Sequence, residues 1–298
     1  MLECVANISE GSSSIVLNDI ESSLISILDI QLLHIDIGKD ANRTVFTFVG
    51  NSSSITLAVI AVLKKCTELI DMTHHQGNHP RIGAFDVCPI IPLYPSTIID
   101  ARNCVKNIVN EINIQNINVG GWMYGESAIV KENFELSNVR RGGYEMISRR
   151  YNNFDFGIFN EYFGAMAIGA RELLLAYNVN LESLDISAAK AIASIIRESS
   201  SNGIPGVRSI GWNCNNYRFS QISCNIVDLV NCTPKMVFDR VSLEAKKMDI
   251  EINGSELIGM APRQAFRDFT SLNYAQEYLG LNSNSEFVLK NRILEEKI

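Results

Sequence analysis

The segment LLHIDIGKDANRTVFTFVG, residues 32–50, contains two successive stretches that favour β-strands, residues 32–38 and residues 44–50. Working outward, the pattern predicts a strand at residues 2–7 and a helix at 12–29 before them. A helix at residues 54–70 and a strand at 84–93 follow. The order β-α-β-β-α-β is that of a ferredoxin-like unit. A further helix at 96–115 and a strand at 117–124 extend this half.

The second half of the chain repeats the same order of elements. Its last helix is expected to begin after Thr233, a residue type that caps helices, with Pro234 in the first turn. Residues 140–165 are rich in Gly, Asn and Arg and are expected to be a connecting loop, and residues 263–298 to add helices. The other expected strands and helices of this half are residues 173–180, 186–198, 207–214, 219–227 and 250–260.

The fold prediction is therefore an α+β protein with two ferredoxin-like (βαββαβ) subdomains, residues 1–172 and 173–298. Two similar sheets side by side would form a cleft between them, where ligands often bind. A length of 298 residues is long for one compact core and agrees with two domains.

The composition limits the classes of function. With 26 Lys+Arg against 33 Asp+Glu, the net charge of −7 argues against a general nucleic-acid-binding protein. No run of about 18 or more apolar residues predicts a membrane span, and no signal peptide is expected. Seven scattered cysteines without metal-type spacing favour reduced thiols in a cytoplasmic protein.

Three of the four histidines fall within six residues, at His74, His75 and His79. Gly77 and Pro80 break any helix there, so these histidines are expected on a loop between a helix and a strand. The fourth lies on the strand 32–38, where alternation puts it and Asp36 opposite Leu33, Ile35 and Ile37. A histidine with an aspartate in reach is a plausible acid–base pair. The alternative is that the loop histidines are merely solvated.

A metal site is a second alternative for this stretch, because Asp86 and Cys88 follow the three histidines. The spacing matches no recognised zinc pattern. Adjacent His74 and His75 also cannot both point the same way from an extended segment. We therefore expect no metal.

Arginines and glycines mark further candidate binding segments. Guanidinium groups pair with carboxylates, and Arg81 lies two residues after His79. Phe163 stands beside Gly164, so it could stack on a flat ring or pack under a tight turn. No GxGxxG, Walker A or GxSxG motif is present. The other arginines considered are Arg43, Arg140, Arg141, Arg171 and Arg208.

Several motifs together resemble one family. The block IDMTHHQGNHPRIGAFDVCP, residues 70–89, is similar to the pattern I-D-M-x-x-H-x-G-x-H-P-R-x-G-A-x-D-V-C-P of the glutamate formiminotransferase family. The stretch NRTVFTFVG at 42–50 and the start ECVANISEG at 3–11 also resemble family segments. So do residues 124–126, 169–171, 176–181, 210–212 and 254–259. The resemblance is to a stand-alone formiminotransferase domain and covers nearly the whole chain.

The resemblance implies a glutamate formimidoyltransferase with tetrahydrofolate as co-substrate, usually a homodimer. It implies that His79 is the catalytic histidine, with Asp36 close to the reacting groups. Arg81 is a candidate clamp for a substrate carboxylate. The folate-contacting segments of the family correspond here to Gly157, Phe163, Gly164, Gly206, Ile210 and Gly211.

The resemblance also implies a reaction of histidine degradation and one-carbon metabolism. The formimino group of N-formimino-L-glutamate would move to N5 of tetrahydrofolate, giving 5-formimidoyltetrahydrofolate and glutamate, with His79 carrying the proton. The same residues would serve formyl transfer or the use of 5-formyltetrahydrofolate. A folate-binding protein without catalysis and a metal-dependent hydrolase are alternatives of other classes. No nucleic acid or membrane is expected as a partner.

Overall fold

The computed structural model describes residues 1–214, 219–281 and 286–298. The chain divides into two compact units, Met1–Glu172 and Leu173–Ile298. Each unit combines helices with one sheet, which confirms the α+β class. Within the described ranges, no helix is both long enough and apolar enough to cross a membrane.

The first unit is built on a seven-stranded sheet with the strand order β2-β3-β1-β4-β7-β5-β6. Along the chain its first six elements alternate as expected, β-α-β-β-α-β. They are β1 (Leu2–Ile8), α1 (Ser14–Ile25), β2 (Gln31–Gly38), β3 (Arg43–Gly50), α2 (Ser52–Leu69) and β4 (Phe85–Pro92). The expected further helix and strand are α3 (Ile98–Ile114) and β5 (Gly120–Gly125).

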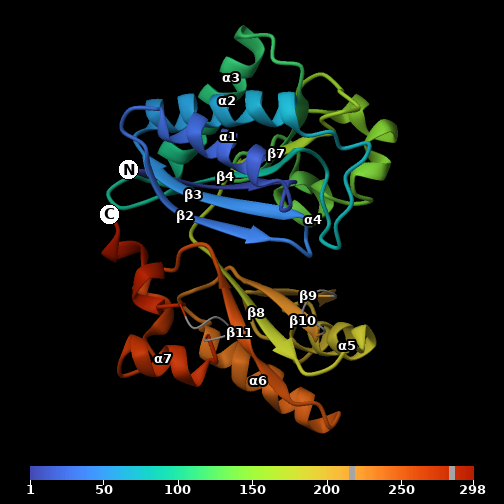
Figure 1. The fold of residues 1–298 in the computed structure, drawn as a ribbon, viewed down its shortest axis with the longest axis vertical. Helices are drawn as coiled ribbons and strands as arrows, with labels where there is room; N and C mark the ends of the chain where they lie inside the picture. The colour runs from blue at the N-terminus through green and yellow to red at the C-terminus, as the bar shows by residue number, and fades with distance from the viewer. Residues whose placement is uncertain (215–218, 282–285) are drawn as a thin grey trace. The chain divides into compact units, whose positions relative to one another are not determined.

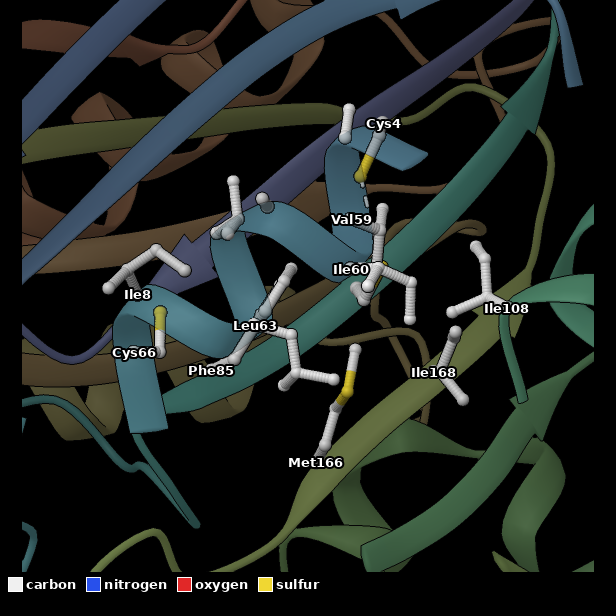
Figure 2. Close-up of a cluster of buried hydrophobic side chains, with 14 of the residues drawn as sticks. Cys4, Ile8, Val59, Ile60, Leu63, Cys66, Phe85, Ile108, Met166 and Ile168 are labelled. Atoms are coloured by element: carbon white, nitrogen blue, oxygen red, sulfur yellow. Dashed lines mark hydrogen bonds between the residues drawn. The ribbon is translucent and has the colours of Figure 1, made fainter. Parts of the chain in front are cut away.

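Helices α1, α2 and α3 lie on one face of this sheet (Figure 1). The main hydrophobic core of the unit lies between these helices and the sheet. Figure 2 shows side chains of α2, such as Val59 and Leu63, directed toward strand residues such as Phe85 and Ile168. On the opposite face, a second buried hydrophobic cluster around Trp122 and Tyr124 covers β4, β5 and β7. The polar side chains of this face lie on β1, β2 and β3.

Strand register places the polar residues on that opposite face. Asp36 on β2 is paired with Val45 on β3, and Val45 is paired with Asn7 on β1. Directly paired residues share one face of a sheet. A bulge between Leu32 and His34 shifts the alternation of β2, so that Leu32 and Ile35 both pack against the core. Asp36 nevertheless points away from the core, as the sequence predicted.

The region expected to be a loop, residues 140–165, contains part of the sheet. Within it, strand β6 (Phe156–Gly157) pairs with β5. Directly after it, β7 (Met166–Ala170), where no element was expected, lies between β4 and β5, parallel to both. All five residues of β7 are buried. A strand buried on both faces shows no alternation of polar and apolar residues, so a five-residue stretch gives little signal in the sequence. Two 3-10 helices, Tyr144–Arg149 and Tyr151–Asn153, precede β6 in this region, and α4 (Leu136–Val139) lies directly before it.

The second unit has a four-stranded sheet with the order β11-β8-β10-β9. Helices α5 and α6 lie on one face of it (Figure 1). The Thr233 hydroxyl accepts a hydrogen bond from the backbone N–H of Met236, which confirms the expected helix cap. The elements are β8 (Leu175–Leu181), α5 (Ile186–Ile196), β9 (Val207–Cys214), β10 (Phe219–Ile226), α6 (Pro234–Lys247) and β11 (Ile252–Ile258).

The C-terminal segment of the second unit is less helical than expected. Among the described residues after β11, one α-helix, α7 (Leu272–Tyr278), is accompanied by three single turns of 3-10 helix.

All seven cysteines of the chain are buried and none is in a disulfide. Burial raises the pKa of the Cys104 and Cys232 thiols to about 11.

Candidate active site

The histidine-containing loop joins α2 to β4 and packs against the turn between β2 and β3. The Asn42 side chain donates to the carbonyl of Gln76 at 2.8 Å, and the backbone N–H of Asn78 donates to Asp40 at 3.3 Å. Gly77 lies so close to Ala41 that a Cβ at Gly77 would collide with the Ala41 carbonyl. The loop is therefore held in place by contacts with a turn about 35 residues earlier.

His74 and His75 have separate structural partners. The exposed His74 ring is paired with Asp71 at 2.9 Å. His75 Nε2 donates to the carbonyl of Asn42 at 3.0 Å, and its Nδ1 accepts from Arg81 Nε at 3.2 Å. Burial and the neighbouring Arg81 lower the His75 pKa, so this ring is neutral at neutral pH. His75 thus ties the loop to the β2–β3 turn.

His79 is half-buried, and its Nδ1 lies 2.9 Å from the carbonyl oxygen of Pro80. A carbonyl only accepts, so Nδ1 carries the hydrogen. Burial, followed by the positive charges of Arg43 and Arg140, lowers the His79 pKa to about 3. The ring is therefore neutral at physiological pH. Its Nε2 keeps a lone pair that can take a proton.

Asp86, at the start of β4, holds two arginines beside His79. Its fully buried carboxylate accepts from Arg43 and from Arg140 through one oxygen, and from the N–H of Ile82 at 2.9 Å through the other. Burial opposes the charge of Asp86, but Arg140 and Arg43 outweigh it, and the Asp86 pKa lies below its ordinary value. Arg43 also donates to the Asn7 side chain at 2.6 and 3.1 Å.

This arrangement leaves one excess positive charge next to a neutral imidazole. The two guanidinium groups are mostly buried, with 11% and 14% of their side chains exposed, and they share a single carboxylate. Such a site suits a negatively charged ligand, since guanidinium groups bind carboxylates with charge-assisted hydrogen bonds. Arg43 and Arg140 were among the arginines considered from sequence, but only the fold brings them together.

Arg81, which the sequence suggested as a clamp for a substrate carboxylate, is bound to groups of the protein itself. Its guanidinium donates to both carboxylate oxygens of Glu145, at 2.8 and 3.2 Å, and to the backbone oxygen of His75. It also lies over the Tyr144 ring, 5.9 Å from the ring centroid. With the bond from Nε to His75, these contacts use four of its five N–H groups, so Arg81 anchors the histidine loop to the segment after α4.

Asp36 lies on the same sheet face as Asn7, the residue that holds Arg43. Asp36 accepts from His34 Nε2 at 2.9 Å, and the two side chains are 17% and 26% exposed. Both remain partly open to solvent on the polar face of the sheet. The structure thus brings Asp36 to the sheet face that carries the Arg43 cluster.

The candidate folate positions of the first unit have packing roles. A Cβ at Gly157, where φ is +67°, would collide with the Val119 carbonyl of the neighbouring chain segment. A Cβ at Gly164, where φ is +78°, would collide with the Ile82 carbonyl. The Phe163 side chain is 1% exposed and belongs to the core, which favours the alternative that it packs under the turn. Its neighbour Tyr162 is 62% exposed.

The candidate folate positions of the second unit differ from one another. Gly211 faces α5, where a Cβ would collide with the backbone of Ala189. Gly206 has φ of +74° and forms the turn that leads into β9. The Ile210 side chain is 40% exposed on the other face of β9, so it is the one available for contact with a ligand.

The ligand-type side chains of the histidine loop do not converge. Across residues 1–214, 219–281 and 286–298, no three His, Cys, Asp or Glu side chains are grouped so that they could hold a metal ion. The loop histidines instead bind Asp71, Arg81 and Pro80 individually.

Sequence comparison adds to this geometry. Residues 1–171 match the N-terminal subdomain of the formiminotransferase domain, and residues 176–275 match the formiminotransferase domain. The chain belongs to the formiminotransferase family. The two matched segments fall within the two compact units.

Relatives of this formiminotransferase family member include proteins of similar length and longer ones. It is 33% identical to the glutamate formimidoyltransferase of Streptococcus pyogenes serotype M1, over 100% of this chain and 98% of that protein. It is 31% identical to that of Thermoplasma acidophilum, over 100% and 97%. It is 32% identical to the formimidoyltransferase-cyclodeaminase of Dictyostelium discoideum over 99% of this chain, and there it spans 60% of the relative's length.

Proposed function

We propose that this protein is a glutamate formimidoyltransferase, which moves the formimino group of N-formimino-L-glutamate to N5 of tetrahydrofolate. The observation that carries the proposal is the neutral His79 ring, whose Nδ1–H is held by the Pro80 carbonyl so that Nε2 is left as a proton acceptor. The names of the full-length relatives support the choice of reaction. The reaction would belong to histidine degradation and one-carbon metabolism.

In this proposal, the N5 amine of tetrahydrofolate attacks the formimino carbon and forms a C–N bond. His79 Nε2 takes the proton that N5 loses. The tetrahedral intermediate then breaks its bond to the glutamate nitrogen, and His79 returns the proton to that nitrogen as glutamate leaves. One proton is taken and one is returned, so the ring ends neutral as it began. Proton transfer of this kind contributes about 100- to 10,000-fold to a rate.

The charges around His79 suit the donor substrate. N-formimino-L-glutamate carries two carboxylates, and the cluster of Arg43, Arg140 and Asp86 has one positive charge in excess. A carboxylate bound there would also raise the His79 pKa toward the range of an effective base. The negative charge of Asp36 would stabilise the amidinium that develops on the formimino group.

The proposal extends to the fold and the assembly. We propose that both units are ferredoxin-like, because each has the order β-α-β-β-α-β and the strand arrangement β2-β3-β1-β4 or its equivalent β9-β10-β8-β11. Of the candidate folate positions, the exposed Gly157 in the first unit and the exposed Ile210 side chain in the second would be available to tetrahydrofolate. Gly164, Gly206 and Gly211 would shape the backbone of these segments. The working form would be a cytoplasmic homodimer.

The deciding experiment mixes purified, metal-free protein with tetrahydrofolate and N-formimino-L-glutamate and follows both products by mass spectrometry. Formation of 5-formimidoyltetrahydrofolate together with glutamate is the expected result. Turnover with 5-formyltetrahydrofolate instead would assign formyl chemistry to the same residues. Folate binding without any turnover would mean that the protein is a binder, and the transferase proposal would be abandoned.

A further inference from the structure

The Pro80 carbonyl, which fixes the hydrogen on His79, has a second donor. Arg140 Nη2 donates to the same oxygen, and the other hydrogen of Nη2 is directed to the Asp86 carboxylate. A carbonyl oxygen has two lone pairs and can accept both bonds. One nitrogen of Arg140 thus connects a fully buried carboxylate to the carbonyl that orients the imidazole.

Arg140 is itself held by the fold. It follows directly after α4, where its backbone N–H donates to the carbonyl of Leu136 at 2.9 Å. Its side chain is only 14% exposed, and its Nε is a buried donor for which no partner is present among the described residues. Asp86 is fixed by Arg43 and by the Ile82 N–H. Arg140 is therefore held by its backbone at α4 and by its guanidinium at Asp86, while the loop residue Pro80 is exposed.

We propose that Arg140 is a positioning residue, which locks the Pro80 carbonyl and thereby keeps the hydrogen of His79 on Nδ1 and the lone pair on Nε2. This inference rests on the proposed function of His79 as a base. It assigns to Arg140 a role that acts through the main chain and not through direct contact with His79. If the Pro80 carbonyl could rotate away, the His79 ring could flip or change its tautomer. Nε2 would then be aligned as the base for only part of the time.

Arg140 also acts on His79 through its charge. Arg43 on β3 and Arg140 after α4 disfavour the charged ring, whereas Asp86 on β4 favours it. Removal of the positive charge of Arg140 must raise the pKa of His79, because one group that disfavours the imidazolium is lost. The acidic limb of the pH profile of kcat/KM should therefore move to higher pH.

The test compares Arg140→Gln with a matched control, Arg141→Gln. Both remove one positive charge from the same segment, but Arg141 is exposed and donates to Asn138. Proteins labelled with ¹⁵N-histidine are titrated, and two-bond ¹H–¹⁵N correlations report the tautomer of each ring. The His79 signals are assigned from their loss in His79→Gln. This readout needs no substrate.

In the wild-type protein and in Arg141→Gln, we expect His79 to be neutral and protonated on Nδ1 near pH 7. In Arg140→Gln, we expect a mixture of tautomers, a raised His79 pKa and a kcat reduced by about 10- to 100-fold. An Arg140→Gln protein with the wild-type tautomer and titration would overturn the inference. Equal changes in Arg141→Gln would also overturn it, because the effect would then be general electrostatics.

A second variant, Arg140→Lys, keeps the test decisive if Arg140→Gln fails to fold. Asp86 keeps Arg43 as a partner in either variant, and Lys additionally keeps the charge. A single ammonium does not replace a planar guanidinium set between two acceptors, so the His79 tautomer should still become mixed while its pKa changes little. A fully retained Nδ1–H tautomer in Arg140→Lys would reject the geometric role.

The two proposals can fail separately. If the wild-type protein does not transfer the formimino group, the proposed function falls, and the NMR spectra still decide whether Arg140 orients His79. If transfer occurs and the His79 spectra of Arg140→Gln match the wild type, only the positioning role falls.

Discussion

At the scale of single residues, the proposed chemistry depends on a neutral histidine beside two arginines. Protonation of His79 is opposed by burial and by Arg43 and Arg140, and its pKa falls to about 3. The unfolded chain would protonate this ring near its ordinary pKa of 6.5. The folded state therefore binds fewer protons in this window, and His79 makes the protein less stable as the pH falls from about 6.5 toward 3.

His79→Gln should reduce turnover by about 100- to 10,000-fold, because an amide cannot shuttle a proton. The steady-state rate of formimino transfer is the measurement. His74→Gln is the matched control, since His74 is exposed and bound to Asp71. Undiminished turnover in a folded His79→Gln protein would remove His79 from the mechanism.

The buried Glu3 has the opposite effect on stability. It is 2% exposed, and burial raises its pKa to about 7 despite the nearby Arg171. A folded-state pKa above the unfolded value gives stability that is complete below the unfolded pKa near 4.5 and is lost as the pH rises through about 7. The wild-type protein should thus lose on the order of 3 kcal/mol of stability from this group across that window.

Glu3→Gln should abolish that loss, because the amide cannot ionise. Urea unfolding at pH 5 and pH 8 measures the difference. The unfolding free energy of the variant minus that of the wild type should therefore be larger at pH 8 than at pH 5. Parallel pH dependences of the two proteins would show that Glu3 does not ionise in this range.

The residues of the site were only partly predictable. His79 could be chosen from the sequence because it lies in a cluster on a loop broken by Gly77 and Pro80. The Arg43–Asp86–Arg140 cluster could not be predicted, since its members are 43 and 54 residues apart in the chain. Nothing local in the sequence indicates that two arginines share one carboxylate. The bond between Arg81 and Glu145 could not be predicted either, because Glu145 is 64 residues away.

At the scale of elements, helix caps and periodic helices could be predicted from the sequence, but strand β7 could not. The cap at Thr233 follows from one residue type and the proline after it. Strand β7 could not be recognised, because its five residues, MAIGA, are all buried and do not alternate. Its place between β4 and β5 depends on partners far away in the chain.

The cap of α6 gives a prediction at this scale. The Thr233 hydroxyl accepts from Met236 N–H and also donates to Asp268, and the residue is 1% exposed. Thr233→Ala should cost about 1 kcal/mol of unfolding free energy, measured by urea denaturation. Thr233→Ser keeps the hydroxyl and should lose clearly less. Equal losses in the two variants would mean that the methyl group, and not the cap, supplies the stability.

At the scale of the whole molecule, each unit contains a hydrophobic core of its own. The main core of the first unit uses residues from Leu2 to Ala170, and the core of the second uses residues from Leu175 to Ile293. A unit with its own core can fold independently. The repetition of β-α-β-β-α-β made this two-part organisation foreseeable from the sequence pattern.

A fragment of residues 1–172 should therefore fold cooperatively on its own. Its thermal unfolding, followed by near-ultraviolet circular dichroism, should show a single sharp transition. A fragment of residues 1–150 is the control, because it lacks β7 and so leaves β4 and β5 without the strand between them. A gradual, non-cooperative loss of signal from the 1–172 fragment would contradict the prediction.

The burial of every cysteine makes the molecule convenient for site-directed labelling. Thiolates are the reactive form, and here burial raises the pKa of thiols such as Cys104 and Cys232 to about 11 and also shields them from reagents. A cysteine introduced at an exposed position, such as Tyr162→Cys or Ile210→Cys, should react with a maleimide fluorophore far faster than the seven native ones. The wild-type background could then carry one optical reporter at a chosen position, without prior removal of any native thiol.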